Sequence, residues 1–226
     1  NCFSWTGQKT NNHEIIHFKR SDNQSVFFDT IVMRKNPEIE ITENKLLSDN
    51  WYLLHKVTFN YKKENQPVES HIREVYDRGN GAAILLYNSP KKTVVLTRQF
   101  RLPTYLNGNK TGMMIEVCAG LLDKENAEQA IIRETEEETG YRLSKVQKVI
   151  ETYMSPGSVT EILHLFVGEY DESMKVSEGG GLDAEQENIE VLEFTFDEAY
   201  SMIESGEITD AKTIMLLQHA KIKGLI

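Results

Sequence analysis

Residues 133–140 read Arg-Glu-Thr-Glu-Glu-Glu-Thr-Gly, and this run of carboxylates limits how the chain can fold more than any other segment. On a helix that turns about 100° per residue, Glu134 and Glu138 lie within about 60° of Ile131, in the middle of an apolar arc. Glu136 lies on the opposite side. Two inward carboxylates one turn apart cost free energy unless positive charge meets them. We therefore expect a core-packed helix whose inward glutamates face a divalent cation.

Glutamates at this spacing are more often solvated or salt-bridged on a helix surface. Here the inward phase and the segment before the helix favour a metal site instead. We expect residues 116–123 to form a loop in which Gly120 lets the backbone approach a ligand closely. The Ala119 carbonyl beside it can complete an oxygen shell for Mg²⁺, which proteins bind through a few carboxylates and the phosphates of a substrate.

The helix has predictable ends, and strands and helices are predicted around it. Asn126 can cap the first turn, with Gln129 at the third helical position, and Gly140 can close the helix. Apolar runs at 82–87 and 93–97 predict a hairpin of strands that are buried on both faces. We further expect strands at 147–153, 163–169 and 189–194, and helices at 196–204 and 210–221. Strands packed between helices make a mixed α/β layer.

The chain before this layer divides into two parts. Residues 1–32 are rich in polar residues and keep no hydrophobic period, so we expect a disordered extension, with Met33 as a natural start. Strand patterns at 38–42, 51–61 and 68–75, with a turn at 62–66, predict a small antiparallel β unit. The expected organisation is therefore an extension at 1–32, a β unit at 33–78 and an α/β domain at 79–226.

Charge and composition exclude several classes of partner. The chain has 25 Lys and Arg against 35 Asp and Glu, a net charge of −10, which opposes nucleic-acid binding by phosphate neutralisation. The longest uninterrupted apolar stretch, 82–87, is too short to cross a membrane. Cys2 and Cys118 form neither a disulfide framework nor a zinc motif, and no secretory signal is visible, so we expect a reducing, cytoplasmic location.

Residues 120–141 resemble the signature of the Nudix hydrolases, G-x5-E-x7-R-E-U-x-E-E-x-G-U, where U is a bulky apolar residue. The match is complete in type and spacing at Arg133, Glu134, Glu137, Glu138 and Gly140. The interval from Gly120 to Arg133 is one residue short, so Glu125 or Asn126 stands for the first glutamate. Outside the signature, 73–81, 98–101 and the triple glycine at 179–181 are similar to the GDP-mannose pyrophosphatases of that superfamily.

This resemblance implies a fold, a reaction and an assembly. The fold is a Nudix-type α/β/α sandwich with a mixed sheet, plus the N-terminal antiparallel β unit. The reaction is Mg²⁺-dependent hydrolysis of GDP-mannose to GMP and mannose 1-phosphate, in a homodimer that the β units at 33–78 hold together. The implied metal ligands are the Ala119 carbonyl, Glu134, Glu138 and Glu187. These three glutamates and Glu137 are the candidate catalytic residues.

The resemblance also implies substrate contacts, each of which has a plainer structural alternative. The candidates are Trp51, Arg73, Glu74, Arg101, Ala119, Gly120, Leu121, Glu138, Glu161, Glu187 and Lys212. Trp51 stacks on a base or packs in a core, Arg101 binds a diphosphate or forms a salt bridge, and Lys212 binds substrate or is solvated. Glu185 is an alternative to Glu187. Two other functions stay open, an ADP-ribose pyrophosphatase and a non-catalytic sensor of nucleotide sugars, and the intact glutamates speak against the sensor.

Overall fold

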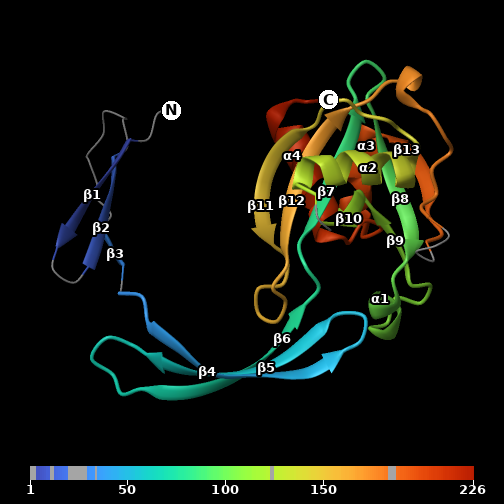
Figure 1. Cartoon of the computed structure of the whole chain (residues 1–226). Helices are drawn as coiled ribbons and strands as arrows, with labels where there is room; N and C mark the ends of the chain where they lie inside the picture. The colour runs from blue at the N-terminus through green and yellow to red at the C-terminus, as the bar shows by residue number, and fades with distance from the viewer. Residues whose placement is uncertain (1–3, 11–12, 20–29, 34, 123–124, 183–186) are drawn as a thin grey trace. The chain divides into compact units, whose positions relative to one another are not determined.

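The chain folds as two units, residues 1–75 and 76–226, and each is described by itself. The computed structural model describes residues 4–10, 13–19, 30–33, 35–122, 125–182 and 187–226, with the backbone alone for the first three segments (Figure 1). The division follows Val75, whereas the sequence predicts a boundary after Arg78. In the described ranges no helix is both long and apolar enough to cross a membrane.

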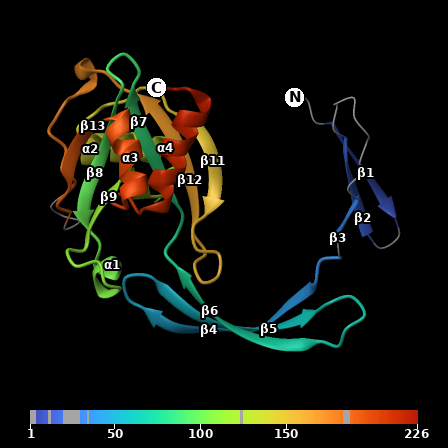
Figure 2. The same ribbon diagram turned by 180° about the vertical axis from the view of Figure 1, so that it is seen from behind.

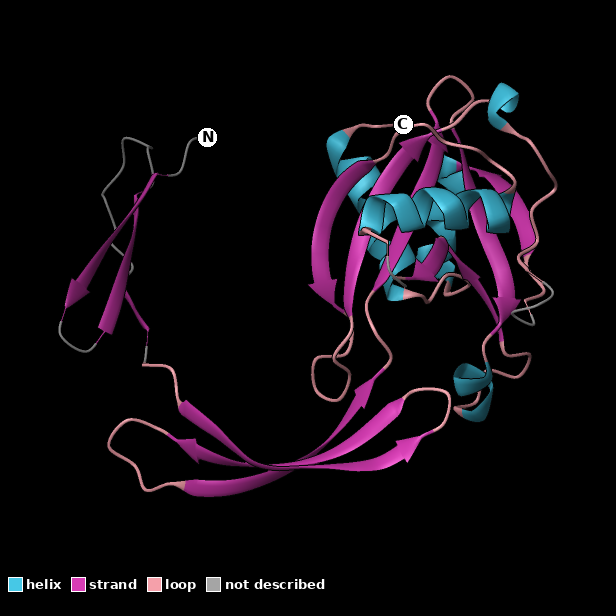
Figure 3. Ribbon diagram, viewed as in Figure 1, coloured by secondary structure: helices cyan, strands magenta, loops and turns pink. Residues whose placement is uncertain are grey.

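The C-terminal unit is built on a seven-stranded sheet whose central strand is the predicted apolar run. The sheet has the order β11 (Gln147–Tyr153), β12 (Ile162–Glu169), β7 (Gly81–Asn88), β8 (Thr93–Phe100) and β13 (Glu190–Thr195). β12 is parallel to β7, and the other neighbours are antiparallel, so the sheet is mixed (Figure 3). The predicted hairpin and the three later strands are confirmed.

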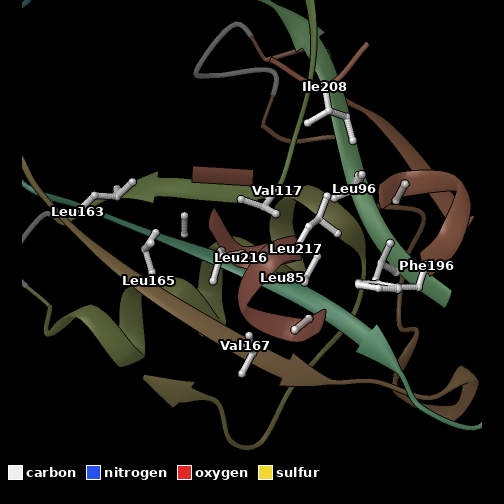
Figure 4. Packing of buried hydrophobic residues seen from close by; sticks show 14 residues of the cluster. Leu85, Leu96, Val117, Leu163, Leu165, Val167, Phe196, Ile208, Leu216 and Leu217 are labelled. Carbon is white, nitrogen blue, oxygen red and sulfur yellow. The ribbon is translucent and has the colours of Figure 1, made fainter. Parts of the chain in front are cut away.

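Alternate residues of β7 pack on opposite faces of the sheet, which explains its unbroken apolar sequence. Ala83 and Leu85 belong to a core cluster with α3 (Phe196–Ser205) and α4 (Ala211–Lys223), shown in Figure 4. Ile84 belongs to a second cluster with α2 (Ala127–Thr139). Figure 1 shows α2 in front of the sheet, and Figure 2, from behind, shows α3 and α4. The predicted α/β/α sandwich is therefore confirmed.

β7 and β8 pair only beside their hairpin, between Leu86–Asn88 and Thr93–Val95. Beyond that point two short strands continue the ladders: β9 (Met113–Glu116) pairs with β8, and β10 (Cys118–Leu121) pairs with β7. The sequence predicts a loop at 116–123, and this prediction is wrong for Glu116 and for Cys118–Leu121, which lie in β9 and β10. The reason is that the edge of β7 left free by β8 needs hydrogen-bond partners, and β10 supplies them.

The helix caps follow the sequence. The Gln129 N–H donates a hydrogen bond of 2.9 Å to Asn126 Oδ1, and Gly140 ends α2 with a left-handed φ of 78°. Thr195 forms a capping box at the start of α3, and the Asp210 carboxylate accepts the first-turn N–H of α4. The sequence does not predict the short helix α1 (Leu102–Leu106) or the 3₁₀ turn η1 (Glu172–Met174).

The N-terminal unit contains two three-stranded sheets. The predicted β unit is formed by β4 (Glu38–Asp49), β5 (Leu53–Lys62) and β6 (Glu69–Asp77), in that order. Of the predicted disordered extension at 1–32, residues 1–3, 11–12 and 20–29 lie outside the described residues. The backbone of the others forms β1 (Ser4–Thr10) and β2 (His13–Lys19), and β2 pairs antiparallel with both β1 and β3 (Thr30–Met33). The β-branched and aromatic residues of β2 and β3 favour this extended conformation.

Replacing Asn126 by Ala should lower the free energy of unfolding by about 1 kcal/mol, because an N–H of the first turn of α2 loses its acceptor. Asn126→Asp keeps an acceptor in the same place and should change the stability little. Denaturant unfolding followed by circular dichroism measures both variants. Equal losses in the two variants would mean that the cap does not stabilise the start of α2.

Candidate active site

α2 turns its glutamates toward the interior in the phase that the sequence predicts. Glu138 is only 1% exposed, and it shares the buried face of the helix with Ile131 and Thr135. Glu134, one turn earlier, keeps 14% of its side chain exposed. Glu136 lies on the outer side, where it forms a salt bridge. The helix therefore carries two carboxylates into the protein beside β10.

Glu138 is a buried carboxylate that forms no ion pair with any residue that the structure describes. Its Oε2 accepts a hydrogen bond from the Ala119 N–H at 3.3 Å. Burial raises the pKa of Glu138 to about 8, the Cys118 thiol opposes this by hydrogen bonding, and the charges of Glu187 and Glu134 add to it. A buried carboxylate without an ion pair among the described residues is suited to receive a cation.

Glu134 packs directly on the backbone of β10 at Gly120. A Cβ at position 120 would lie 2.1 Å from Glu134 Cδ, so a residue with a side chain does not fit unless Glu134 moves. Burial raises the pKa of Glu134 to about 7, against the effect of the Arg133 guanidinium at 3.0 Å. The two glutamates thus contact adjacent residues of one strand, Glu138 at Ala119 and Glu134 at Gly120.

Arg133 orients the outer carboxylates of the site. Its guanidinium contacts Glu125 at 3.2 Å, Glu134 at 3.0 Å and Glu137 at 2.7 Å. Glu137, a predicted catalytic residue, is therefore engaged by Arg133, and its part in the chemistry stays a prediction. Arg133 is not among the site residues predicted from the sequence, although its place in the signature is a signal for such a role.

The triple glycine lets the chain pass close to the C-terminal end of α2. The Gly180 N–H donates to the carbonyl oxygen of Glu138 at 2.8 Å, and a Cβ at Gly179 would lie 2.4 Å from that oxygen. The Gly181 N–H donates to the carbonyl oxygen of Glu137 at 3.1 Å, so this segment supplies donors to carbonyls that the last turn of a helix leaves without partners. Glu185 lies outside the described residues.

Glu187 is held at the end of this segment. Its Oε2 accepts a hydrogen bond from the Leu182 N–H at 3.1 Å, and its charge contributes to the raised pKa values of Glu134 and Glu138. In the described part of the chain, no three His, Cys, Asp or Glu side chains are grouped so as to hold a metal ion. The preformed part of the site is the pair Glu134 and Glu138 of α2, packed against β10. A ligand role for Glu187 stays a prediction.

Glu161, the residue before β12, lies near Gly120 of β10 and the start of β7. A Cβ at Gly81 would lie 3.3 Å from Glu161 Oε1 and 3.2 Å from the Gly120 carbonyl oxygen. Glu161 Oε1 is 3.6 Å from Arg78 Nε. Leu121, the next residue of β10, is half-buried opposite Gly81. The structure therefore gathers Glu161, Gly120 and Leu121 around the start of β7.

Arg101 and Lys212 meet at Glu116, a residue that the sequence analysis does not single out. Arg101 donates from Nε at 2.8 Å and from Nη2 at 3.2 Å to the two oxygens of Glu116. Lys212 contacts Glu116 and, at 2.9 Å, Asp210. Burial would raise the pKa of Glu116, but Lys212 and Arg101 lower it to about 2. No signal marked Glu116, because the strand β9 that carries it was not predicted.

Three predicted substrate contacts belong to the N-terminal unit. Trp51 is 77% exposed, and its ring meets that of Tyr52 edge-on, so the alternative of core packing is wrong. Arg73 donates to the Ile72 carbonyl at 2.7 Å, and Glu74 is exposed. Their roles in binding stay predictions.

Two family models match adjacent parts of the chain. The GDP-mannose pyrophosphatase NudK N-terminal domain matches residues 38–76, and the NUDIX domain matches residues 77–217, more than half of the chain. The chain belongs to the Nudix hydrolase family. Nudix hydrolases generally use divalent metal ions, and the two inward glutamates of α2 lie within the matched domain.

Curated relatives of this Nudix hydrolase match it over most of its length. The GDP-mannose pyrophosphatase of Pectobacterium atrosepticum is 59% identical over 186 residues, 82% of this chain and 95% of the relative. That of Escherichia coli O1:K1 is 51% identical over 189 residues, 84% of this chain and 98% of the relative. A crystal structure of an ADP compounds hydrolase matches 85% of this chain and 98% of its own, with a TM-score of 0.62. At 16% identity this match shows the fold alone.

Gly120→Ala should reduce the activity of this Nudix hydrolase by at least tenfold while the fold persists, because the new methyl group displaces Glu134. Gly157→Ala is the matched control, since nothing lies within 4 Å of a Cβ at this exposed position. Turnover and the melting temperature measure the two effects separately. Normal turnover in Gly120→Ala would mean that the position of Glu134 does not matter.

The raised pKa values of Glu134 and Glu138 predict a pH-dependent stability. Carboxyls whose pKa is higher in the folded state stabilise the fold while protonated, and this contribution is lost as the pH rises through about 7 to 8. We expect the melting temperature in EDTA to fall between about pH 5 and pH 8. Glu138→Gln should flatten that fall, and Mg²⁺ should oppose it in the wild type. The same slope in wild type and variant would mean that other groups titrate.

Proposed function

We propose that this protein hydrolyses the diphosphate of GDP-mannose, with Mg²⁺, to GMP and mannose 1-phosphate. The observation that supports this most is the pair Glu134 and Glu138, carried into the interior against Ala119 and Gly120, with Glu138 forming no ion pair among the described residues. Such a pair favours a reaction at phosphorus, because Mg²⁺ is bound by a few carboxylates together with substrate phosphates. The identity of the substrate is inferred from the relatives. Those relatives are named GDP-mannose pyrophosphatases, and the family model that matches residues 38–76 is the GDP-mannose pyrophosphatase NudK N-terminal domain.

Oxygen donors of this kind suit Mg²⁺, which proteins bind through a few carboxylates while substrate phosphates complete the shell. The proposed ligands are Glu134, Glu138, Glu187 and the Ala119 carbonyl. When bound, the ion neutralises phosphate charge and lowers the pKa of water. The buried Glu138 supports this assignment, since its burial without an ion pair in the described residues is relieved by a cation.

The other residues of the site bind substrate and move a proton. Arg101 is half-exposed and keeps donors that Glu116 does not use, so it supports a role in binding the diphosphate together with Lys212. Glu161, near Gly120 and Leu121, and the catalytic candidate Glu137 add carboxylates at the edges of the site. One of the carboxylates accepts the proton of the attacking water.

The N-terminal unit is proposed to complete the binding site and to form a homodimer. Its β4–β6 sheet exposes apolar side chains at Ile39, Ile41 and Ile72, each more than half exposed. Exposed apolar groups on one small sheet support an interface. Trp51, Arg73 and Glu74 are its proposed contacts with the nucleotide. We also propose a reducing, cytoplasmic location.

We expect the protein to hydrolyse GDP-mannose faster than ADP-ribose, and ADP-ribose faster than a UDP-sugar, because all present a diphosphate but differ in what flanks it. The assay is a panel of the three nucleotides with Mg²⁺, with products analysed after reaction in heavy-oxygen water. The control is Glu138→Gln, which lacks one of the two carboxylates that the proposal assigns to the metal. Faster turnover of ADP-ribose would replace the proposal by an ADP-ribose pyrophosphatase. Tight binding of GDP-mannose without turnover would make the protein a sensor.

A further inference from the structure

Glu116 and Glu138 are the two buried glutamates among the described residues, and their surroundings are opposite. Glu138 has no ion pair there, whereas Glu116 is contacted by both Arg101 and Lys212. The side chain of Glu116 is 5% exposed, that of Lys212 is 12% exposed and that of Arg101 is 39% exposed. Exposure therefore increases from Glu116 outward, with the arginine at the rim.

Both cations keep donors that Glu116 does not occupy. Arg101 uses its Nε–H and one Nη2–H for Glu116, which leaves the Nη1 donors available for another anion. The Lys212 ammonium contacts Glu116 and Asp210, and a further N–H remains on it. By binding some N–H donors of Arg101 and Lys212, the Glu116 carboxylate fixes the orientation of both side chains. It thereby fixes the direction in which their unused N–H donors point.

Glu116 is itself fixed by a closed set of hydrogen bonds. The Val117 N–H donates to Thr213 Oγ1 at 2.8 Å, and this hydroxyl donates to Asp210 Oδ2 at 2.6 Å. Asp210 Oδ1 pairs with Lys212, which returns to Glu116. The end of β9 and the first turn of α4 are thereby joined. Such a network holds a side chain in one orientation, because moving any member breaks several bonds.

We propose that Glu116 is a positioning residue, which aims Arg101 and Lys212 at the diphosphate of the substrate. The inference rests on the proposed function for the identity of the substrate, and on the contacts of Glu116 for the positioning. Glu116 lies three positions before Ala119, whose N–H binds Glu138, so the contacts to the two cations and to the carboxylate pair lie on one continuous segment. Glu116 itself needs no contact with substrate.

A different role for Glu116 predicts the opposite effect on binding. If Glu116 only neutralised the two cations, its removal would leave Arg101 and Lys212 with more net positive charge for an anion, and diphosphate would bind more tightly. If Glu116 positions them, its removal lets both side chains disperse, and diphosphate binds more weakly. The sign of the change therefore separates the two roles.

The test compares Glu116→Gln with Glu136→Gln. Both substitutions remove a carboxylate that binds an arginine through two hydrogen bonds, but Glu136 holds Arg142 at the surface. We expect the KM for GDP-mannose to rise about tenfold in Glu116→Gln, with kcat changed less than about threefold, and neither to change in Glu136→Gln. Binding of inorganic pyrophosphate with Mg²⁺, measured by calorimetry, should weaken by a similar factor in Glu116→Gln.

An unchanged KM, or tighter pyrophosphate binding, in folded Glu116→Gln would overturn the proposal. If that variant does not fold, Glu116→Asp keeps the charge but shortens the side chain, and it should raise the KM in the same way. An unchanged KM in Glu116→Asp would then refute the positioning role. If the wild type hydrolyses no nucleotide sugar, the proposed function fails, and the pyrophosphate measurement still decides whether Glu116 positions the two cations.

Discussion

The burial of the Glu138 carboxylate against β10 is the constraint on which the site depends. Its hydrogen bond from the Ala119 N–H ties the catalytic-domain helix to one strand, and burial favours the protonated form in the free protein. A cation bound at this carboxylate would favour its ionisation at neutral pH, and would thereby link metal binding, proton release and stability through one side chain. Glu134, less buried and paired with Arg133, is the more easily ionised member of the pair.

The sheet creates the place where this burial is possible. β7 and β8 separate after three paired residues, and β10 takes the free edge of β7 directly under α2. Glycine at 120 allows the Glu134 side chain to lie on the strand, and glycine at 179 allows the following segment to cross the end of the helix. Each close approach excludes a Cβ, so Gly120 allows packing against a carboxylate, and Gly179, at a left-handed φ of 72°, allows packing against the helix backbone.

The sequence predicted the parts of this structure whose signals are local. The inward phase of Glu134 and Glu138 follows from helical periodicity, the ends of α2 from Asn126 and Gly140, and the double burial of β7 from its apolar run. β10 was missed because its residues have no strand pattern of their own, and their pairing depends on where β8 leaves β7. Glu116 was missed for the same reason, since its partners Arg101 and Lys212 are distant in sequence and meet it only through the fold.

Residues 116–119 join the two halves of the site. Glu116 carries the contacts to Arg101 and Lys212, and Ala119 carries the contact to Glu138. An extended chain spans about 3.3 Å per residue, so the Cα atoms of these two positions are at most about 10 Å apart. The contact points of the cations and of Glu138 therefore lie on one short stretch of backbone. Side-chain changes in this segment alter one half of the site, whereas an insertion or deletion would move the two halves apart and shift the pairing of β10.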